Sequence, residues 1–166
     1  YFYMLLELCV GGNLHQLRND LGGFDIGTVR FFAASLILAL HHLHSLSVCY
    51  RDLKPENIMV QRDGFIRLVD LGSAKVLSDH PRTYTICGTP EYMSPEMCIG
   101  VGHDWRTDLW SLGITIHELL HGYTPFYDPM DQYSTYRKVL TEDVEFPGPE
   151  DYGVKPGQCH PSVPIS

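Results

Sequence analysis

The chain has 166 residues, of which 44% are hydrophobic, and this is enough to form the core of one ordinary domain. Its formal net charge of −8 argues against a nucleic-acid backbone as a partner and suits a basic substrate. We see no signal peptide and no apolar run approaching the roughly 20 residues of a membrane span, so we expect neither.

The five cysteines are scattered along the chain and form no Cys-x-x-Cys pair. Small secreted domains use closely placed cysteines for disulfides, and structural zinc sites use paired ones. The pattern therefore indicates reduced thiols in a cytoplasmic, intracellular protein.

The first elements we expect are one strand and two helices. Residues 1–8 are an aromatic and aliphatic run of strand length, closed by Gly11-Gly12. Residues 13–21 fit a short helix. Asp25 is a good N-cap for a second helix of some 20 residues, because apolar residues recur at helical spacing from Val29 to Leu43.

Three histidines in the second helix could suggest a metal site. Only His41 and His44 share a helix face, and no cysteine or carboxylate stands at ligand spacing from them. We therefore interpret His41, His42 and His44 as surface and packing residues.

A hairpin is expected after residues 50–57, Tyr-Arg-Asp-Leu-Lys-Pro-Glu-Asn. Residues 58–60 and 66–69 have strand character, and Asp63-Gly64 is a strong two-residue turn signal. With that turn, Asn57 lies opposite Asp70, with Cα atoms about 5 Å apart. An amide oxygen and a carboxylate side by side suit a hard cation such as Mg²⁺, which leaves its other positions to water and phosphate.

Two further residues of the loop before this hairpin have chemistry of their own. Asp52 lies five residues before Asn57 and could accept a proton from a nucleophile. Lys54 carries a compact positive charge suited to a phosphate. The predicted geometry suggests metal-assisted phosphoryl transfer, whereas taken singly Asp52 or Asp70 could be a helix cap or a member of a structural ion pair.

The remaining chain is expected to be mainly helical. Residues 73–87 are polar without a sustained period, and a loop of this length is usually functional. Residues 105–121 are apolar almost all round, which predicts a buried central helix, with Gly122 as its C-cap. Residues 131–140 fit another helix. Prolines interrupt the sequence from residue 147 on, so we expect residues 148–166 to be a disordered or divergent tail.

Three motifs in the same order and spacing resemble those of eukaryotic protein kinases. Residues 50–57 resemble the kinase catalytic loop, Asp70-Leu71-Gly72 resembles the metal-binding motif, and residues 88–96 resemble the end of the activation segment. The chain is similar to Ser/Thr kinases of the cyclic-nucleotide-dependent group (protein kinases A, G and C). The resemblance implies an α+β fold over residues 1–147: the mainly helical large lobe with a small catalytic-loop β-hairpin, the N-terminal lobe being absent.

The resemblance also implies a function, which is transfer of the γ-phosphoryl group of ATP to serine or threonine hydroxyls of protein substrates. By this match Asp52 is the catalytic aspartate and Lys54 the γ-phosphate lysine. Asn57 and Asp70 are the Mg²⁺ ligands, so ATP and Mg²⁺ are the expected cofactors. Lys54 together with Thr89 is typical of serine/threonine specificity in the family.

The first eight residues match the kinase hinge strand. On that match Leu6 is the gatekeeper, and the backbones of Glu7 and Cys9 bind the adenine edge. An ordinary buried strand is the alternative interpretation. Asp108 matches the aspartate that braces the catalytic-loop backbone, although a carboxylate at a helix start has a simpler electrostatic explanation. Glu96, at the end of the activation segment, is interpreted as structural.

Thr85 matches the activation-loop phosphorylation site, and Arg51 and Lys75 match the basic partners of its phosphate. The alternative is an unmodified loop threonine. Glu56 and Glu118 match carboxylates that hold a substrate arginine two residues before the phosphoacceptor. Solvated surface glutamates are the competing interpretation for these two residues.

The sequence also departs from the family. Leu71 replaces the usual phenylalanine, Ser73 stands where this group often has phenylalanine, and Asn13 replaces a glutamate that binds a second substrate arginine. The chain has no Gly-rich loop and no strand lysine for the α and β phosphates. We therefore expect a kinase fragment that is inactive alone.

Two rival interpretations remain open. The first is a non-catalytic kinase-like docking or regulatory module, which the missing ATP-binding motifs favour. The second is a small-molecule kinase, which would not explain the activation segment. The partners expected for a protein kinase are protein substrates with basic residues and a regulatory domain or subunit.

Overall fold

The structure is a computed structural model that describes residues 1, 3, 5–77 and 81–144. Within these residues the helices are α1 (Leu14–Leu21), α2 (Ile26–Ser45), α3 (Pro95–Cys98), α4 (Arg106–His121) and α5 (Gln132–Thr141). The strands are β1 (Val48–Cys49), β2 (Ile58–Val60), β3 (Ile66–Leu68) and β4 (Lys75–Val76), paired as β1 with β4 and β2 with β3. Three short 3₁₀ helices are η1 (Pro55–Asn57), η2 (Leu71–Ser73) and η3 (Pro90–Tyr92).

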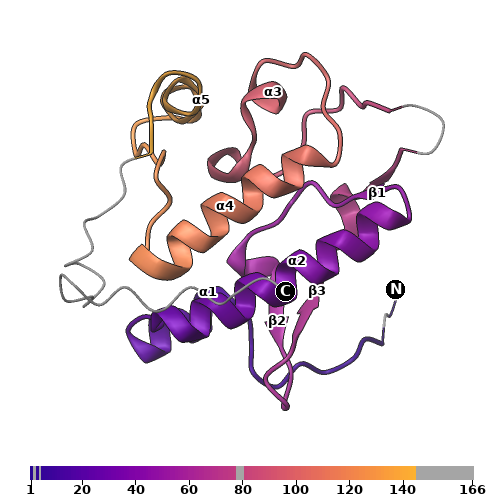
Figure 1. The fold of residues 1–166 in the computed structure, drawn as a ribbon, viewed down its shortest axis with the longest axis vertical. Coiled ribbons are helices and arrows are strands. Elements are labelled where there is room, and N and C mark those ends of the chain that lie inside the picture. Colours follow the sequence, from indigo (N-terminus) through magenta and orange to yellow (C-terminus); the bar gives the residue numbers. More distant parts are fainter. Residues whose placement is uncertain (2, 4, 78–80, 145–166) are drawn as a thin grey trace, which may run out of the picture.

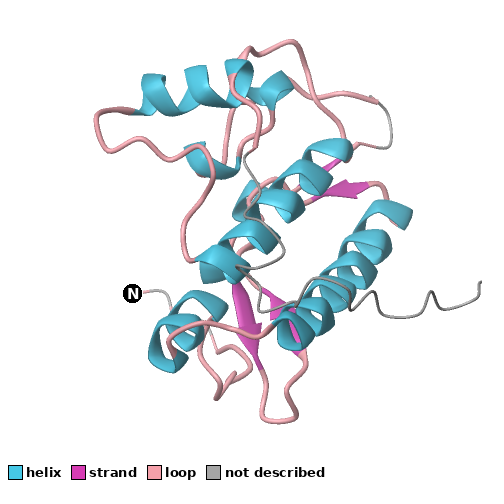
Figure 2. Ribbon diagram, turned by 60° about the vertical axis from the view of Figure 1, so that its left-hand side comes forward, coloured by secondary structure: helices cyan, strands magenta, loops and turns pink. Residues whose placement is uncertain are grey.

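Helices dominate the fold, and the two antiparallel strand pairs are small, as Figure 2 shows. The predicted class, a mainly helical lobe with a short β-hairpin, is confirmed. Helices α2 and α4 lie side by side through the middle of the molecule (Figure 1), with the β2–β3 hairpin packed on α2 and with α3 and α5 beyond α4.

Helix α2 begins where the sequence predicts. The Asp25 carboxylate accepts hydrogen bonds from the backbone N–H groups of Gly27 and Thr28, which stabilises the first turn by about 1 kcal/mol. The buried positions follow one face of the helix: Val29, Phe32, Leu36 and Leu40. These side chains form the main core together with the following residues of the other elements: Leu14, Tyr50, Leu53, Ile58, Val60, Ile66, Leu112 and Leu119.

The expectation that no apolar run approaches the length of a membrane span is wrong for α2. This helix has 20 residues, and its most apolar window has a mean hydropathy of 1.5, so by length and composition it could cross a membrane. One such helix is weak evidence for a span, because a core helix passes the same test. In α2 the fully buried Leu36 and Leu40 pack within the main core.

The predicted central helix and the helix after it are both confirmed. Helix α4 ends at Gly122, whose left-handed backbone (φ 88°) directs its N–H to the Glu118 carbonyl. Helix α5 begins after Asp131, whose carboxylate accepts from the Ser134 N–H at 2.7 Å. A second, smaller core joins α4, α5 and η3 through four buried side chains: Tyr92, Ile114, Phe126 and Val139.

The predicted hairpin strands are confirmed, but the predicted register is wrong by one residue. Ile58 pairs with Leu68 and Val60 with Ile66, and a three-residue loop lies between Gln61 and Phe65. The cause is Gly64, which has a left-handed backbone (φ 86°) and closes a three-residue loop rather than a two-residue turn.

Because of this register, Asn57 faces Val69 in the ladder and not Asp70. The Val69 N–H donates to the Asn57 carbonyl at 3.0 Å. Asp70 is therefore the residue after the pair, at the end of the hairpin, where it has a left-handed backbone of its own (φ 58°).

The strand expected over residues 1–8 is not found in the part of this segment that the structure describes. Leu6 and Leu8 are 73% and 82% exposed, so they are not residues of an ordinary buried strand. A strand needs a partner for its backbone N–H and C=O groups, and no described strand pairs with this segment. The tail predicted at residues 148–166 lies outside the described residues.

Candidate active site

The loop between β1 and η1 is fixed to the two central helices by one buried carboxylate. Asp108, in the first turn of α4, is fully buried. Its Oδ1 accepts from the Arg51 N–H at 2.7 Å, and its Oδ2 accepts from the Tyr50 N–H at 2.9 Å. The carboxylate therefore binds the loop rather than the N–H groups of its own helix.

His44, in the last turn of α2, completes this contact, with its Nε2 2.7 Å from Asp108 Oδ2. The sequence interpretation of His44 as a surface or packing residue missed this hydrogen bond. Its only signal in the sequence is its place at the end of the helix that leads into the loop. The histidine and the aspartate together connect α2, the loop and α4 at one point.

Asp52, Lys54, Asn57 and Thr89 form one cluster, as the sequence expectation requires. The Asp52 carboxylate accepts from Asn57 Nδ2 at 3.0 Å and from the Thr89 hydroxyl at 3.1 Å. Lys54 Nζ is 3.2 Å from Asp52 Oδ2 and donates to the Thr89 hydroxyl at 2.7 Å. The Asp52 and Lys54 side chains are 12% and 21% exposed, so the cluster is largely screened from water but can still be reached.

The Asn57 and Asp70 side chains offer oxygen atoms that fit a hard cation. Asn57 Nδ2 donates to the Asp52 backbone carbonyl at 2.9 Å and to its carboxylate at 3.0 Å, which leaves the amide oxygen as the atom that could bind a cation. Asp70 is exposed, and one of its oxygens accepts from the Gly72 N–H at 3.1 Å. Both groups are of the type that Mg²⁺ prefers.

Tyr50 lies close to the carboxylates of Asp52 and Asp70. Its ring is fully buried, and its hydroxyl donates to the Val69 carbonyl, next to Asp70. Burial raises the pKa of the Tyr50 hydroxyl, and the charges of Asp52 and Asp70 raise it further. The two carboxylates are therefore both close to the same hydroxyl, although they belong to different segments.

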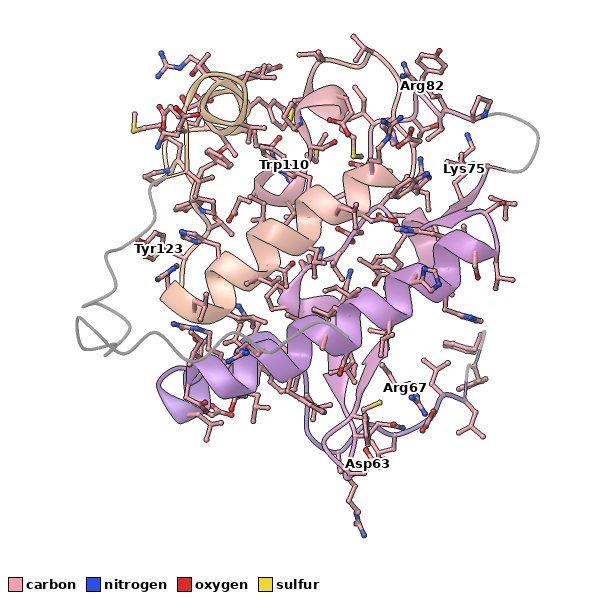
Figure 3. All side chains as sticks on the ribbon, viewed as in Figure 1. Asp63, Arg67, Lys75, Arg82, Trp110 and Tyr123 are labelled. Atoms are coloured by element: carbon pink, nitrogen blue, oxygen red, sulfur yellow. The ribbon has the colours of Figure 1, made fainter. Side chains whose placement is uncertain are left out.

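The residues predicted to form the activation-loop phosphorylation site are only partly brought together. Lys75 Nζ donates to the Thr83 hydroxyl at 2.8 Å, and Lys75 and Thr85 line the same pocket of about 660 Å³. Arg51 instead donates from Nε to the Ser73 carbonyl at 2.7 Å, and its buried Nη1 has no hydrogen-bond partner among the described residues. Arg82, which the sequence analysis did not single out, also lines the pocket (Figure 3).

Glu118 is buried, with its side chain 10% exposed, so the interpretation as a solvated surface glutamate is wrong for this residue. The Tyr92 hydroxyl donates to its Oε2 at 2.5 Å, and His15 Nδ1 is 3.4 Å from its Oε1. Burial raises the pKa of the Glu118 carboxyl, and the nearby Glu56 adds to this effect, whereas the Tyr92 hydrogen bond opposes it. Glu56 itself is exposed.

The remaining predicted residues are Glu7, Cys9 and Glu96. Glu7 lies 3.8 Å from Arg67 Nε, and the Cys9 carbonyl accepts from the Gly12 N–H at 3.4 Å. Glu96 is half-buried in α3 and lines a pocket of about 360 Å³.

Comparison with known proteins places the chain in a family. Residues 1–154 match the family model described as "Protein kinase domain". The chain is 47% identical over 149 residues to cGMP-dependent protein kinase 2 of Rattus norvegicus, covering 89% of this chain and 19% of that protein. It is 45% identical over 155 residues to the cAMP-dependent protein kinase catalytic subunit PRKX of Homo sapiens, covering 93% and 42%.

A third relative is cAMP-dependent protein kinase catalytic subunit 3 of Drosophila melanogaster, 44% identical over 144 residues, which is 87% of this chain and 24% of that protein. The chain thus spans less than half the length of each of these relatives. The predicted resemblance to cyclic-nucleotide-dependent Ser/Thr kinases is confirmed, and the chain belongs to the protein kinase family.

Proposed function

We propose that this chain carries the catalytic loop of a serine/threonine protein kinase, which transfers the γ-phosphoryl group of ATP to hydroxyls of protein substrates near basic residues. The observation that supports the proposal most is the cluster of Asp52, Lys54, Asn57 and Thr89. A lysine and an amide that both contact one carboxylate are unnecessary for a docking module, but these are the groups that phosphoryl transfer needs.

In the proposed reaction, Asp52 orients the substrate hydroxyl and accepts its proton as the hydroxyl oxygen bonds to the γ-phosphorus. Lys54 provides positive charge for the oxygens of the transferred group. Thr89 accepts from Lys54 and donates to Asp52, so its hydroxyl holds the base and the cation in fixed relative positions. Most of the rate enhancement in such reactions comes from this kind of positioning.

Asn57 and Asp70 would hold Mg²⁺, and the backbones of Glu7 and Cys9 would bind the adenine edge. When bound, ATP would supply the phosphoryl group, and Mg²⁺ would neutralise part of its charge. This chain supplies amide and carboxylate oxygens whose orientation is fixed by Asp52 and Gly72.

Regulation by phosphorylation at Thr85 is part of the proposal. Thr85 is exposed and shares its pocket with the cations of Lys75 and Arg82. Arg51 has a buried Nη1 that a phosphate oxygen could satisfy, and Arg51 directly precedes Asp52. A phosphate on Thr85 that binds Arg51 would therefore couple the ordering of residues 73–87 to the position of Asp52.

The proposed setting is the cytoplasm, where thiols stay reduced. Cys9, Cys49, Cys87 and Cys98 are free thiols in the described part of the chain. A regulatory domain or subunit, by analogy with the cyclic-nucleotide-dependent relatives, is the further partner that we propose.

The test uses this chain joined to a nucleotide-binding N-terminal lobe, here named the restored enzyme. Asp52→Asn should lower kcat for a serine peptide by several orders of magnitude, since the amide cannot take the proton. Asp104→Asn, which changes another carboxylate to an amide away from the cluster, is the control and should keep most of the activity. Equal rates for Asp52→Asn and the parent would rule out the proposed base.

A further inference from the structure

His15 lies in the first turn of α1 and contacts the buried carboxylate of Glu118 on α4. The distance from His15 Nδ1 to Glu118 Oε1 is 3.4 Å, and the imidazole is 45% exposed whereas the carboxylate is 10% exposed. The histidine is therefore the more exposed partner of a largely buried carboxylate.

The surroundings of Glu118 are acidic. Glu56 and Glu91 are close enough to raise the pKa of Tyr92, and Tyr92 donates its only hydroxyl proton to Glu118. Arg18, one turn after His15, is held elsewhere, because its Nε donates to the Leu119 carbonyl at 3.2 Å. Among the described residues, His15 is the basic side chain within ion-pair distance of Glu118.

Asn13, at the start of the same helix, adds no charge to this region. Its side-chain oxygen accepts from the Gln16 N–H at 2.8 Å, so the side chain is used as the helix cap. Helix α1 therefore presents a histidine, and no carboxylate from its first turn, toward the acidic pair Glu56 and Glu118.

We propose that His15 is a specificity-determining residue, whose imidazole competes with a basic side chain of the substrate for Glu118. This inference rests on the proposed function, which makes Glu56 and Glu118 the site for that side chain. A substrate arginine must displace the His15 contact or share Glu118 with it. The kinase should therefore prefer basic residues less strongly than the two carboxylates alone would dictate.

The test is a binding measurement on the 166-residue chain, so it does not depend on catalysis. Two serine peptides are compared that carry arginine or its neutral isostere citrulline two residues before the serine. Assays are run near pH 6.5, about the ordinary pKa of histidine. The ratio of the two dissociation constants, citrulline over arginine, reports the preference for the charge.

The expected order of this ratio is His15→Gln above the parent and the parent above His15→Lys. Each step should be about two- to five-fold, the range of a half-exposed ion pair. His41→Gln removes an exposed histidine from α2 and should leave the ratio unchanged. In the parent with ¹³C-labelled histidines, the ring signal that His15→Gln abolishes should move on addition of the arginine peptide and not of the citrulline peptide.

Two further variants separate this inference from the function on which it rests. Glu118→Gln keeps an acceptor for the Tyr92 hydroxyl, and Glu56→Gln changes an exposed residue, so both should fold. If neither variant lowers the ratio, Glu56 and Glu118 are not the site for a basic side chain, and the proposed substrate preference fails as well. If either lowers the ratio while the three His15 forms give the same value, only the role of His15 is refuted.

Discussion

Replacing Asp108 by asparagine should strongly destabilise the chain, because this carboxylate accepts three hydrogen bonds in a fully buried position. An asparagine side chain has the same shape but offers one oxygen and one NH₂ group. Whichever way the amide turns, the NH₂ group faces a backbone N–H, either that of Tyr50 or that of Arg51.

The magnitude follows from the groups that lose their partner. One buried N–H left without an acceptor costs about 1–3 kcal/mol, and a hydrogen bond to a charged group is worth about 1.5–3 kcal/mol. The hydrogen bond from His44 also changes from a bond to a carboxylate to a contact with a neutral amide, or is lost. Asp108→Asn should therefore lower the free energy of unfolding by about 3–5 kcal/mol, against a total of about 5–15 kcal/mol for a typical domain.

Urea unfolding of the 166-residue chain, followed by circular dichroism, measures this change. Asp104→Asn is a matched control four residues earlier, since Asp104 pairs with Arg106, whose side chain is 64% exposed. Asp104 is itself 14% exposed, but an asparagine there keeps an oxygen that can accept from the Arg106 N–H, and an ion pair with an exposed arginine is worth about 1 kcal/mol. The control should therefore shift the midpoint less than Asp108→Asn does. If the two variants shift the midpoint equally, the buried contact does not stabilise the loop and the reasoning is wrong.

Three other predictions concern the metal site, the buried glutamate and the activation segment. In the restored enzyme, Asp70→Asn should raise the Mg²⁺ concentration needed for half-maximal activity; an unchanged requirement would contradict its role as a ligand. Because burial raises the pKa of Glu118, the stability it contributes is present below its unfolded pKa and is lost as pH rises through its folded pKa. Glu118→Gln should therefore stabilise the chain against urea at pH 7 and not at pH 4, and equal effects at both would exclude this linkage. Thr85→Ala should lower kcat/KM of the restored enzyme about tenfold or more, since one charge-assisted hydrogen bond is worth roughly 1.5–3 kcal/mol. Arg51→Ala should abolish the increase in kcat/KM that phosphorylation of Thr85 causes. A normal increase in Arg51→Ala would disprove the coupling.

The helices were predictable because their ends are fixed by local chemistry. Asp25 and Asp131 cap α2 and α5 through backbone N–H groups two or three residues away. Gly122 ends α4 because it adopts a left-handed backbone at little cost. Each of these signals can be read within one helical turn, so no knowledge of the tertiary structure is needed.

The hairpin register and the first strand were not predictable in the same way. An Asp-Gly pair serves both a two-residue turn and a three-residue loop, and the choice depends on whether Gly64 occupies the turn or follows it. Residues 1–8 have the composition of a strand, but a strand forms only against a neighbour. The sequence of the segment cannot contain that information.

In the candidate site, too, the contacts within one short segment were predictable and the contacts between distant segments were not. Asp52, Lys54 and Asn57 lie within six consecutive residues, so their proximity follows from the sequence. His44 and His15 lie outside the three motifs, and Tyr92 lies within residues 88–96 but has no role that the motif alone indicates. Each of the three acquires its contact only when segments distant in the sequence pack together, so these contacts could not be predicted from the sequence.

The contact of Thr89 with Asp52 has a consequence for how activity and substrate recognition depend on each other. Thr89 is the N-cap of η3, and Tyr92 at the end of η3 donates to the buried Glu118. A shift of this turn would therefore move a hydrogen bond to the proposed base and a hydrogen bond to the proposed substrate site together. Since both bonds come from one 3₁₀ turn and its cap, order in the predicted activation segment should affect kcat and peptide affinity jointly rather than separately.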